Sequence, residues 1–300
     1  MNNSSLIPEK VPELWFTDAD VVFQAGSKLF RVHRSILSAR STIFNDMFSV
    51  PHPDSDRIVD ADGSYTHIHL PDDAIDVHHF FLAIFDASYF EPPPSDQPTS
   101  VVVSILRLAH KYDVVFLKRR AVAHLNVLFP TEWDGLWKLM IENDHTTAAD
   151  NLSLLELAPA IEIPWVLPAV HFLLATTSIN LIFNLEAWNL LEASIQRNCL
   201  IKRENCMSEL AVSSRWIWSH TTAPSCLSVG TCTNILGLIQ KMSGIWKVVS
   251  DIPSVFCKKC SKTTQAKCYT SGAQVWDGLP KLIGLGSWED LNSAKKSFDN

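Results

Sequence analysis

The sequence predicts an α+β unit at the N-terminus, a short sheet flanked by helices, followed by a mostly α-helical C-terminal region. Runs rich in β-branched and aromatic residues occur only before Pro130, where they alternate with apolar residues at helical spacing. After Pro130 the strand signals stop, and apolar helical segments are separated by Pro, Asn or Ser. With 300 residues, 47% of them hydrophobic and 19% charged, the chain can bury a sizeable core.

A β-hairpin is the first element that the sequence predicts. Residues 20–25 and 29–33 are β-rich runs on either side of residues 26–28, and a short connector that contains glycine is typical of a hairpin. A third strand is expected over residues 66–70, where apolar and polar residues alternate. Residues 51–64 are polar and rich in Asp, Pro and Gly, so we expect an exposed loop there.

Helices are predicted between and after these strands. Residues 35–40 and 41–48 favour two short helices, and Ser41 is placed to cap the second. Three longer helices follow, each with a polar residue positioned to begin it: Asp72 or Asp73, Thr99 or Ser100, and Asp113. Beyond Pro130, helical segments are expected over residues 131–143, 152–163, 169–176, 181–197 and 204–218.

These signals divide the chain into four regions. We expect an N-terminal tail over residues 1–16, the α+β domain over residues 17–130, a helical extension over residues 131–220 and a cysteine-containing C-terminal region over residues 221–300. Residues 1–9 are polar and lack the positive and apolar segments of a secretory signal. An intracellular protein, cytoplasmic or nuclear, is therefore expected.

Charge and hydropathy argue against two classes of partner. The net charge of −7 provides no global positive field, so nucleic acid is not expected as the main partner, although residues 241–300 are mildly basic with 9 basic and 5 acidic side chains. The most lipid-like stretch, residues 163–183, contains Pro164 and Pro168. Prolines four residues apart break a helix, so no membrane span is expected.

Four sequence blocks stand out within residues 17–130: DVVF at residues 20–23, FRVHRSIL at 30–37, STIFNDMF at 41–48 and LAHKYDV at 108–114. Together these blocks resemble the BTB/POZ domain. The joint spacing of the blocks is specific, and the match covers about residues 15–129. Residues 157–174 and the WEDL motif at residues 288–291 are similar to BTB-domain proteins of mushroom-forming (basidiomycete) fungi.

The resemblance implies a BTB/POZ-like fold and a protein-binding role. Such domains bind other proteins by dimerising, by engaging a cullin scaffold of a ubiquitin ligase, or by recruiting other regulators. By resemblance to the cullin-facing surface of BTB-like adaptors, the candidate partner-binding residues here are Phe48, Tyr89 and Tyr112. Only about seventeen residues precede Asp18, so the extra N-terminal helix that long-form BTB dimers exchange is expected to be missing.

A metal site is the second site that the sequence predicts, and its candidate ligands are cysteines. Cys226 and Cys232 form one close pair and Cys257 and Cys260 another, with 24 residues between the pairs. Two such pairs on turn-prone segments are typical of a tetrahedral zinc site, which would be structural because four protein ligands leave no open position. Cys268 could replace one ligand. The alternative is that these cysteines are small buried hydrophobes in a reducing compartment, and the sequence leaves both open.

The remaining polar motifs favour no catalytic site. His33 and Asp20 are interpreted as structural groups, and the histidines at 67, 69, 78 and 79 as a solvated edge. The usual nucleotide, zinc-protease and hydrolase signatures are absent. The predicted function is a non-enzymatic protein-interaction module, either a substrate adaptor for a cullin-type ubiquitin ligase or a self-associating scaffold. The alternatives are a transcription or chromatin regulator with a basic C-terminal tail, and a redox or metal-dependent enzyme.

Overall fold

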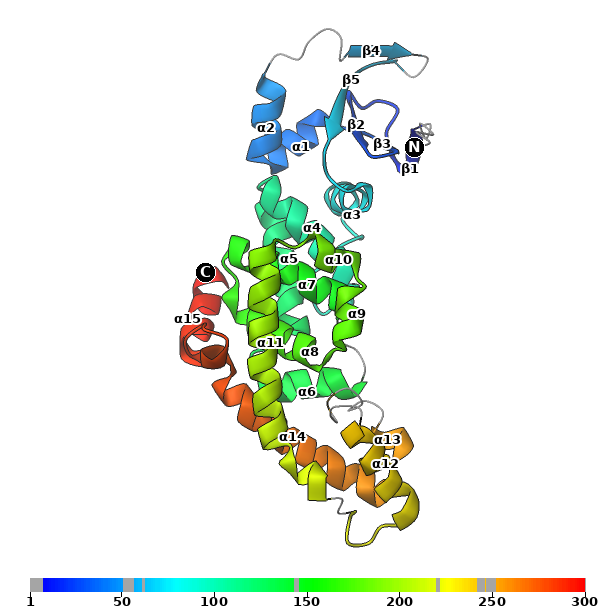
Figure 1. Ribbon diagram of the computed structural model, residues 1–300. Helices are drawn as coiled ribbons and strands as arrows, with labels where there is room; N and C mark the ends of the chain where they lie inside the picture. Colours follow the sequence, from blue (N-terminus) through cyan, green and yellow to red (C-terminus); the bar gives the residue numbers. More distant parts are fainter. Residues whose placement is uncertain are drawn as a thin grey trace. The chain divides into compact units, whose positions relative to one another are not determined.

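The computed structural model describes residues 8–50, 57–60, 63–142, 146–219, 222–241, 246 and 252–299. The chain separates into two compact units, Met1–His124 and Leu125–Asn300. All the described strands belong to the first unit, and the second is built from helices (Figure 1). The predicted fold class, an α+β domain followed by a mostly helical region, is therefore confirmed.

A mixed five-stranded sheet forms one side of the N-terminal unit. Its strands are β1 (Glu9–Trp15), β2 (Val21–Ala25), β3 (Lys28–Val32), β4 (Arg57–Asp60) and β5 (Gly63–Leu70), in the order β1-β3-β2-β5-β4. The predicted hairpin is β2 and β3, which pair antiparallel. Gly26 in its turn has φ = 52°, a left-handed conformation that glycine adopts without strain. The third predicted strand is β5, which lies parallel to β2.

The two edge strands correct the sequence prediction. Strand β1 lies within the region expected to be a tail (1–16), and β4 lies within the expected loop (51–64), of which residues 51–56, 61 and 62 fall outside the described residues. An edge strand pairs on one side only, so its sequence need not alternate. In β1 the buried residues Val11 and Leu14 are three apart, because the register with β3 shifts between Lys10 and Trp15.

Four helices complete this unit: α1 (Arg34–Arg40), α2 (Thr42–Ser49), α3 (Ala74–Phe85) and α4 (Thr99–Lys111). A fifth, α5 (Val115–Leu128), begins in it and ends in the second unit, which starts at Leu125. A group of fully buried phenylalanines joins the sheet to two of these helices. Phe23 of β2 lies 5.6 Å from Phe44 of α2 and 5.4 Å from Phe81 of α3, measured between ring centroids. Aromatic pairs at this spacing contribute beyond their buried area, so this group fixes how the helices lie on the sheet.

The helix caps show where the local sequence alone predicts the start of a helix and where it does not. Ser41 Oγ accepts a hydrogen bond of 2.9 Å from Phe44 N, and Asp73 Oδ1 accepts one of 2.8 Å from Ile75 N, as predicted. The prediction of a Thr99 or Ser100 cap is wrong, because Pro98 occupies the N-cap position of α4 without a side-chain cap. Helix α5 begins at Val115 and not at Asp113, which has a left-handed φ of 52°.

Besides the end of α5, the C-terminal unit contains ten α-helices of the described residues and two short 3-10 helices (Pro164–Val166 and Arg215–Ser219). The α-helices are α6 (Trp133–Glu142), α7 (Ala148–Ile161), α8 (Leu167–Thr176), α9 (Ile179–Phe183), α10 (Glu186–Leu190), α11 (Ala193–Ser213), α12 (Val229–Lys241), α13 (Ile252–Val255), α14 (Lys258–Leu282) and α15 (Trp288–Asp299). Within the described residues, no helix combines the length and the apolar character that a membrane crossing requires.

Two details of the helical region differ from the prediction. Residues 181–197 contain parts of three helices, and α11 runs without a break through residues 198–203. Polar residues on the exposed side of α11 interrupt its apolar pattern but not its backbone hydrogen bonds. The expected helical extension (131–220) and cysteine-containing region (221–300) lie in one compact unit, in which α11 packs against α14.

A group of large aromatic side chains forms the centre of the C-terminal unit. Trp133 of α6 has its ring centroid 5.4 Å from Phe172 of α8 and 5.9 Å from Trp276 of α14. A Cβ atom at Gly272 of α14 would lie 2.2 Å from Trp133 Cζ2 and 2.9 Å from Trp246 Cη2. Only glycine therefore allows α14 to approach these rings so closely.

We predict that Gly272→Val lowers the stability of the C-terminal unit by about 3 kcal/mol, because the added side chain overlaps two tryptophan rings. Nine of the ten tryptophans lie in this unit, so urea unfolding of the full chain followed by tryptophan fluorescence measures the effect. Gly278→Ala on the same helix is the control. No atom lies within 4 Å of its added Cβ, so it should stabilise by up to about 1 kcal/mol. Equal stability of the two variants would contradict the packing described here.

A second prediction concerns the N-terminal boundary. A fragment of residues 17–130 lacks β1, which buries Val11 and Leu14 and covers the edge of β3. Burial of each of these side chains is worth about 2 kcal/mol. The fragment 17–130 should therefore melt lower than the fragment 8–130, or aggregate through the exposed edge of β3. Thermal unfolding and light scattering of the two fragments provide the test, and identical melting would show that β1 contributes nothing.

Candidate functional site

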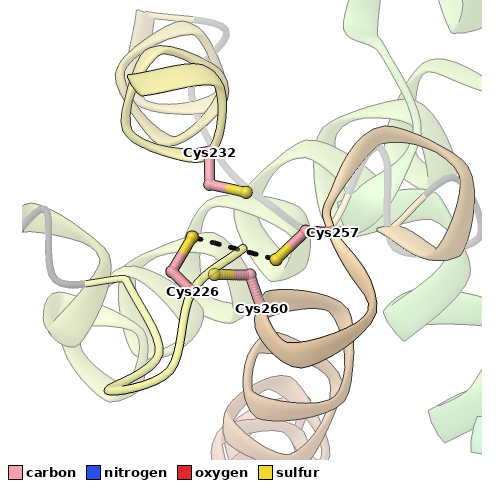
Figure 2. A group of neighbouring side chains, drawn as sticks. All are labelled: Cys226, Cys232, Cys257 and Cys260. Atoms are coloured by element: carbon pink, nitrogen blue, oxygen red, sulfur yellow. Dashed lines mark hydrogen bonds between the residues drawn. The ribbon is translucent and has the colours of Figure 1, made fainter. Parts of the chain in front are cut away.

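The four cysteines of the predicted metal site lie together. The Sγ atoms of Cys226, Cys232, Cys257 and Cys260 are all within 4.8 Å of one another, and the Sγ atoms of Cys226 and Cys257 are 3.8 Å apart (Figure 2). In the part of the chain that the structure describes, this is the only group of three or more His, Cys, Asp or Glu residues that could hold a metal ion. We call these four residues the cysteine cluster.

The four sulfur atoms come from two helix N-termini and one turn. Cys257 is the N-cap residue of α14 and Cys260 lies in its first turn, so the CxxC spacing places both side chains on one side of the helix. Cys232 lies in the first turn of α12, and Cys226 lies in the turn that precedes that helix. The chain therefore changes from turn to helix between Cys226 and Cys232, and this change brings the two cysteines together despite their wide spacing.

The geometry of the cysteine cluster fits a tetrahedral metal ion. Four sulfur atoms at about 2.3 Å from a zinc ion are about 3.8 Å from one another. The distance between Cys226 Sγ and Cys257 Sγ is already 3.8 Å, and the other pairs need to move inward by no more than about 1 Å. An all-thiolate set selects soft or borderline ions such as zinc.

Backbone N–H groups surround the sulfur atoms. Ala223 N donates to Cys260 Sγ at 3.3 Å, and Ser228 N donates to Cys226 Sγ at 3.4 Å. The N–H groups of Cys260 and Leu227 lower the pKa of Cys257 to about 6. Burial raises the pKa of Cys232, and it raises that of Cys260 to about 12. A bound cation is therefore what would allow all four thiols to ionise together.

The other cysteines do not join the cluster. Cys268 lies eight residues beyond Cys260 on α14, about 12 Å along the helix, and is not in the group of neighbouring cysteines, so the prediction that it could replace a ligand is wrong. Cys199 and Cys206 are buried on α11. The redox alternative has one feature in its favour, since Cys257 and Cys260 do lie at a helix N-terminus. No βαβ unit contains that helix, because every described strand lies in the other unit.

Tyr112, one of the three predicted partner-binding residues, is buried. Its side chain is 3% exposed and its ring stacks on Phe44 with centroids 4.5 Å apart. Its hydroxyl donates to Asp72, and burial together with this carboxylate raises the pKa of the phenol. Tyr112 therefore belongs to the core and not to a surface that a partner contacts. Its burial corrects the prediction that it binds a partner.

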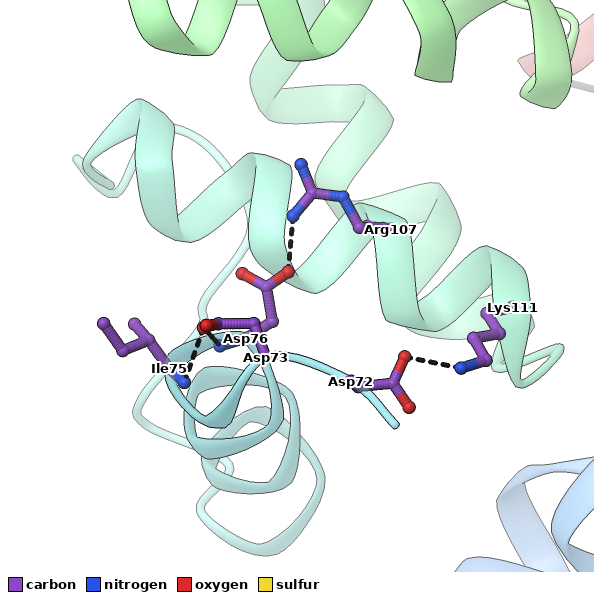
Figure 3. Close-up of polar contacts among 6 residues, drawn as sticks. All are labelled: Asp72, Asp73, Ile75, Asp76, Arg107 and Lys111. Carbon is purple, nitrogen blue, oxygen red and sulfur yellow. Dashed lines mark hydrogen bonds and ion pairs between the residues drawn. The ribbon is translucent and has the colours of Figure 1, made fainter. Parts of the chain in front are cut away.

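Polar contacts beside Tyr112 tie α3 to α4 (Figure 3). Lys111 Nζ of α4 donates to Asp72 at 2.5 Å, and Arg107 of the same helix donates to Asp76 in the first turn of α3. Asp73, between these carboxylates, caps α3. Because the Asp72 and Asp76 side chains are only 10% exposed, water screens these ion pairs less than it screens typical surface pairs.

The other two predicted residues, Phe48 and Tyr89, are half-buried. The Arg34 guanidinium lies 4.9 Å from the Phe48 ring centroid, and the Tyr89 hydroxyl lies 2.5 Å from Nδ1 of His79. Part of each ring faces solvent, so their partner-binding role stays a prediction. Asp20 accepts a hydrogen bond of 3.1 Å from Arg34 N, as its structural interpretation implies.

Comparison with protein families agrees with this fold. Residues 14–127 match the BTB/POZ domain, whose expected limits here were 17–130. This part of the chain is therefore a BTB/POZ domain, a protein–protein interaction module, and such domains are generally not enzymes. None of the curated proteins compared with the chain matches it. The similarity to BTB-domain proteins of mushroom-forming fungi accordingly stays a prediction.

We predict that Cys257 is the first cysteine to be alkylated once metal has been removed with a chelator. Its pKa of about 6 leaves it mostly as the thiolate at pH 7, whereas burial keeps Cys232 and Cys260 protonated. Between pH 7 and pH 5 its rate with iodoacetamide should fall only about tenfold, against about a hundredfold for an ordinary thiol. Peptide mapping of the labelled chain identifies the site. Earlier labelling of Cys232 or Cys260 would contradict the hydrogen bonds to Cys257.

Proposed function

We propose that this protein is a non-enzymatic adaptor or scaffold with a structural zinc ion. The observation that carries the proposal is the BTB/POZ domain over residues 14–127, followed by a separate helical unit. In this proposal the BTB/POZ domain binds either a cullin scaffold of a ubiquitin ligase or a second copy of the chain. The helical unit then presents a further surface to a protein that the adaptor recruits.

Exposed apolar side chains on α1 and α2 support the protein-binding role. Ile36 is 39% exposed and Ile43 is 42% exposed, and Phe48 on α2 is half-buried beside them in sequence. Apolar and aromatic groups that remain partly exposed on a folded domain are favoured at protein interfaces. We propose that these side chains, together with Tyr89, contact the partner.

The cysteine cluster supports the structural role of zinc. Its four thiolates would fill the coordination sphere of the ion, so no open position remains for a substrate or a water molecule. The exposed side chains of Lys258 and Lys259 lie next to the ligands and offset the negative charge of four thiolates. Bound zinc would fasten the turn before α12 to the start of α14.

The basic helix α14 favours the second candidate function, a transcription or chromatin regulator. Lys258, Lys259 and Lys262 are exposed within its first two turns, and Asp277 is the only acidic residue on the helix. A face of this kind attracts phosphate groups. Binding to duplex DNA that weakens steeply as salt rises would support this candidate, and its absence leaves the adaptor.

We predict that the full chain, purified without added metal, contains about one equivalent of zinc. Cys257→Ser combined with Cys260→Ser removes half of the ligands and should abolish zinc retention. Cys268→Ala is the control, since Cys268 lies outside the cysteine cluster, and it should keep the metal. Elemental analysis gives the result. Less than about a tenth of an equivalent in the unmutated chain, or full retention in the double variant, would reject the zinc proposal.

We also predict that Ile43→Asp combined with Phe48→Ala reduces partner binding at least about tenfold, because it places charge on an apolar interface and removes an aromatic anchor. Affinity purification of the tagged chain with quantitative mass spectrometry measures recovery of a cullin or of a second, untagged copy. Leu190→Asp in the other unit, where Leu190 is 76% exposed, is the control and should not change recovery. Unchanged recovery with the folded double variant would exclude Ile43 and Phe48 as partner contacts.

A further inference from the structure

A cavity of about 250 Å³ lies among α7, α8 and α11 of the C-terminal unit, away from the cysteine cluster in sequence. Leu155, Leu167 and Ile195 contribute apolar walls, while His171 and Lys202 contribute polar groups. Nothing in the proposed function uses this cavity. Its volume equals that of several water molecules at about 30 Å³ each, so a small ring or a short alkyl chain fits.

His171 is a buried polar group that faces this cavity without a partner. Its side chain is 4% exposed, and within the described residues it makes no hydrogen bond. Burial and the nearby Lys202 ammonium lower its pKa to about 3, so the imidazole is neutral and keeps one N–H donor. Its ring nitrogens are not fully enclosed, so they are accessible from the cavity, and a molecule inside the cavity can provide the partner that a buried polar group usually has.

Lys202 is a second polar group that lines this cavity without a partner. It is half-buried, and among the residues that the structure describes no carboxylate lies within ion-pair distance of its ammonium. Burial lowers its pKa, which reflects the cost of holding this charge away from water. Glu156 lines the same cavity but is exposed and forms no ion pair with Lys202. An anion in the cavity would supply the missing counter-charge.

We propose that this cavity binds a small organic anion, a carboxylate with an apolar body. Its oxygen atoms accept hydrogen bonds from Lys202 and His171, and its body packs against Leu155 and Leu167. A single ligand thereby satisfies both unpartnered donors and fills the apolar part of the cavity. This site is separate from the BTB/POZ domain and from the cysteine cluster, so it is independent of the proposed function.

A metal ion is a poorer occupant of this cavity. Its potential ligands are His171, Cys199 and Glu156, and burial raises the pKa of the Cys199 thiol to about 11. Among the described residues, these three side chains do not form a group whose ligand atoms lie close enough together to hold a metal ion. The positive charge of Lys202 also repels a cation. Water alone is the remaining alternative, and the experiment below separates it from an organic anion.

The test uses the full chain and two probes, sodium benzoate and sodium hexanoate, titrated at constant ionic strength and followed by isothermal calorimetry and saturation-transfer NMR. Saturable binding at one site is expected, with a Kd on the order of 1 mM for such small ligands. Benzamide, which has the same ring without the charge, should bind at least about tenfold more weakly. This comparison needs no variant, so it holds whether or not a substitution disturbs folding.

Three variants locate the site. Lys202→Met removes the cation and should weaken benzoate binding at least about tenfold, whereas Lys138→Met, which removes an exposed cation on α6, should leave it unchanged. Glu156→Gln removes a negative charge from the cavity and should strengthen binding about threefold. The proposal is overturned if neither carboxylate binds saturably, which indicates water alone, if benzamide binds as well as benzoate, or if Lys202→Met binds as the unmutated chain does.

Discussion

The close approach of α14 to α6 at Gly272 is the constraint on which the C-terminal unit depends. A side chain there would overlap the Trp133 ring, so the helix can lie in its place only because the residue is glycine. The same helix begins with Cys257 and Cys260, about three to four turns earlier. An aromatic contact in the middle of α14 therefore sets the position of two of the four sulfur atoms.

Three hydrogen bonds support this aromatic core, whereas Trp133 Nε1 at its centre has no partner among the described residues. Trp276 Nε1 donates to the carbonyl of Thr131, Trp288 Nε1 donates to the carbonyl of Trp276, and Trp246 Nε1 donates to Ser214 Oγ. A buried indole N–H without a partner costs free energy, so these bonds let the unit bury large rings at low cost. The same rule makes His171 informative, since its ring has no such bond among the described residues.

The two units support different parts of the proposed function. In the BTB/POZ domain most of the aromatic side chains are core groups, as Tyr112 shows, which leaves the exposed part of α1 and α2 for a partner. In the C-terminal unit, α11 lines the proposed anion cavity and packs against α14, which carries half of the cysteine cluster. Both proposed ligands would therefore bind within one packed unit, apart from the protein-binding domain.

The sequence by itself determined the α+β-then-helical order, the hairpin around Gly26, the caps at Ser41 and Asp73, and the two cysteine pairs, because each depends on neighbours within a few residues. Only the tertiary structure decided that β1 and β4 are edge strands, that Tyr112 is buried, that Cys268 is apart from the other cysteines and that His171 faces a cavity. Strand pairing, burial and the distance between sulfur atoms depend on residues far apart in the chain. Local sequence patterns do not indicate which of these distant residues come into contact.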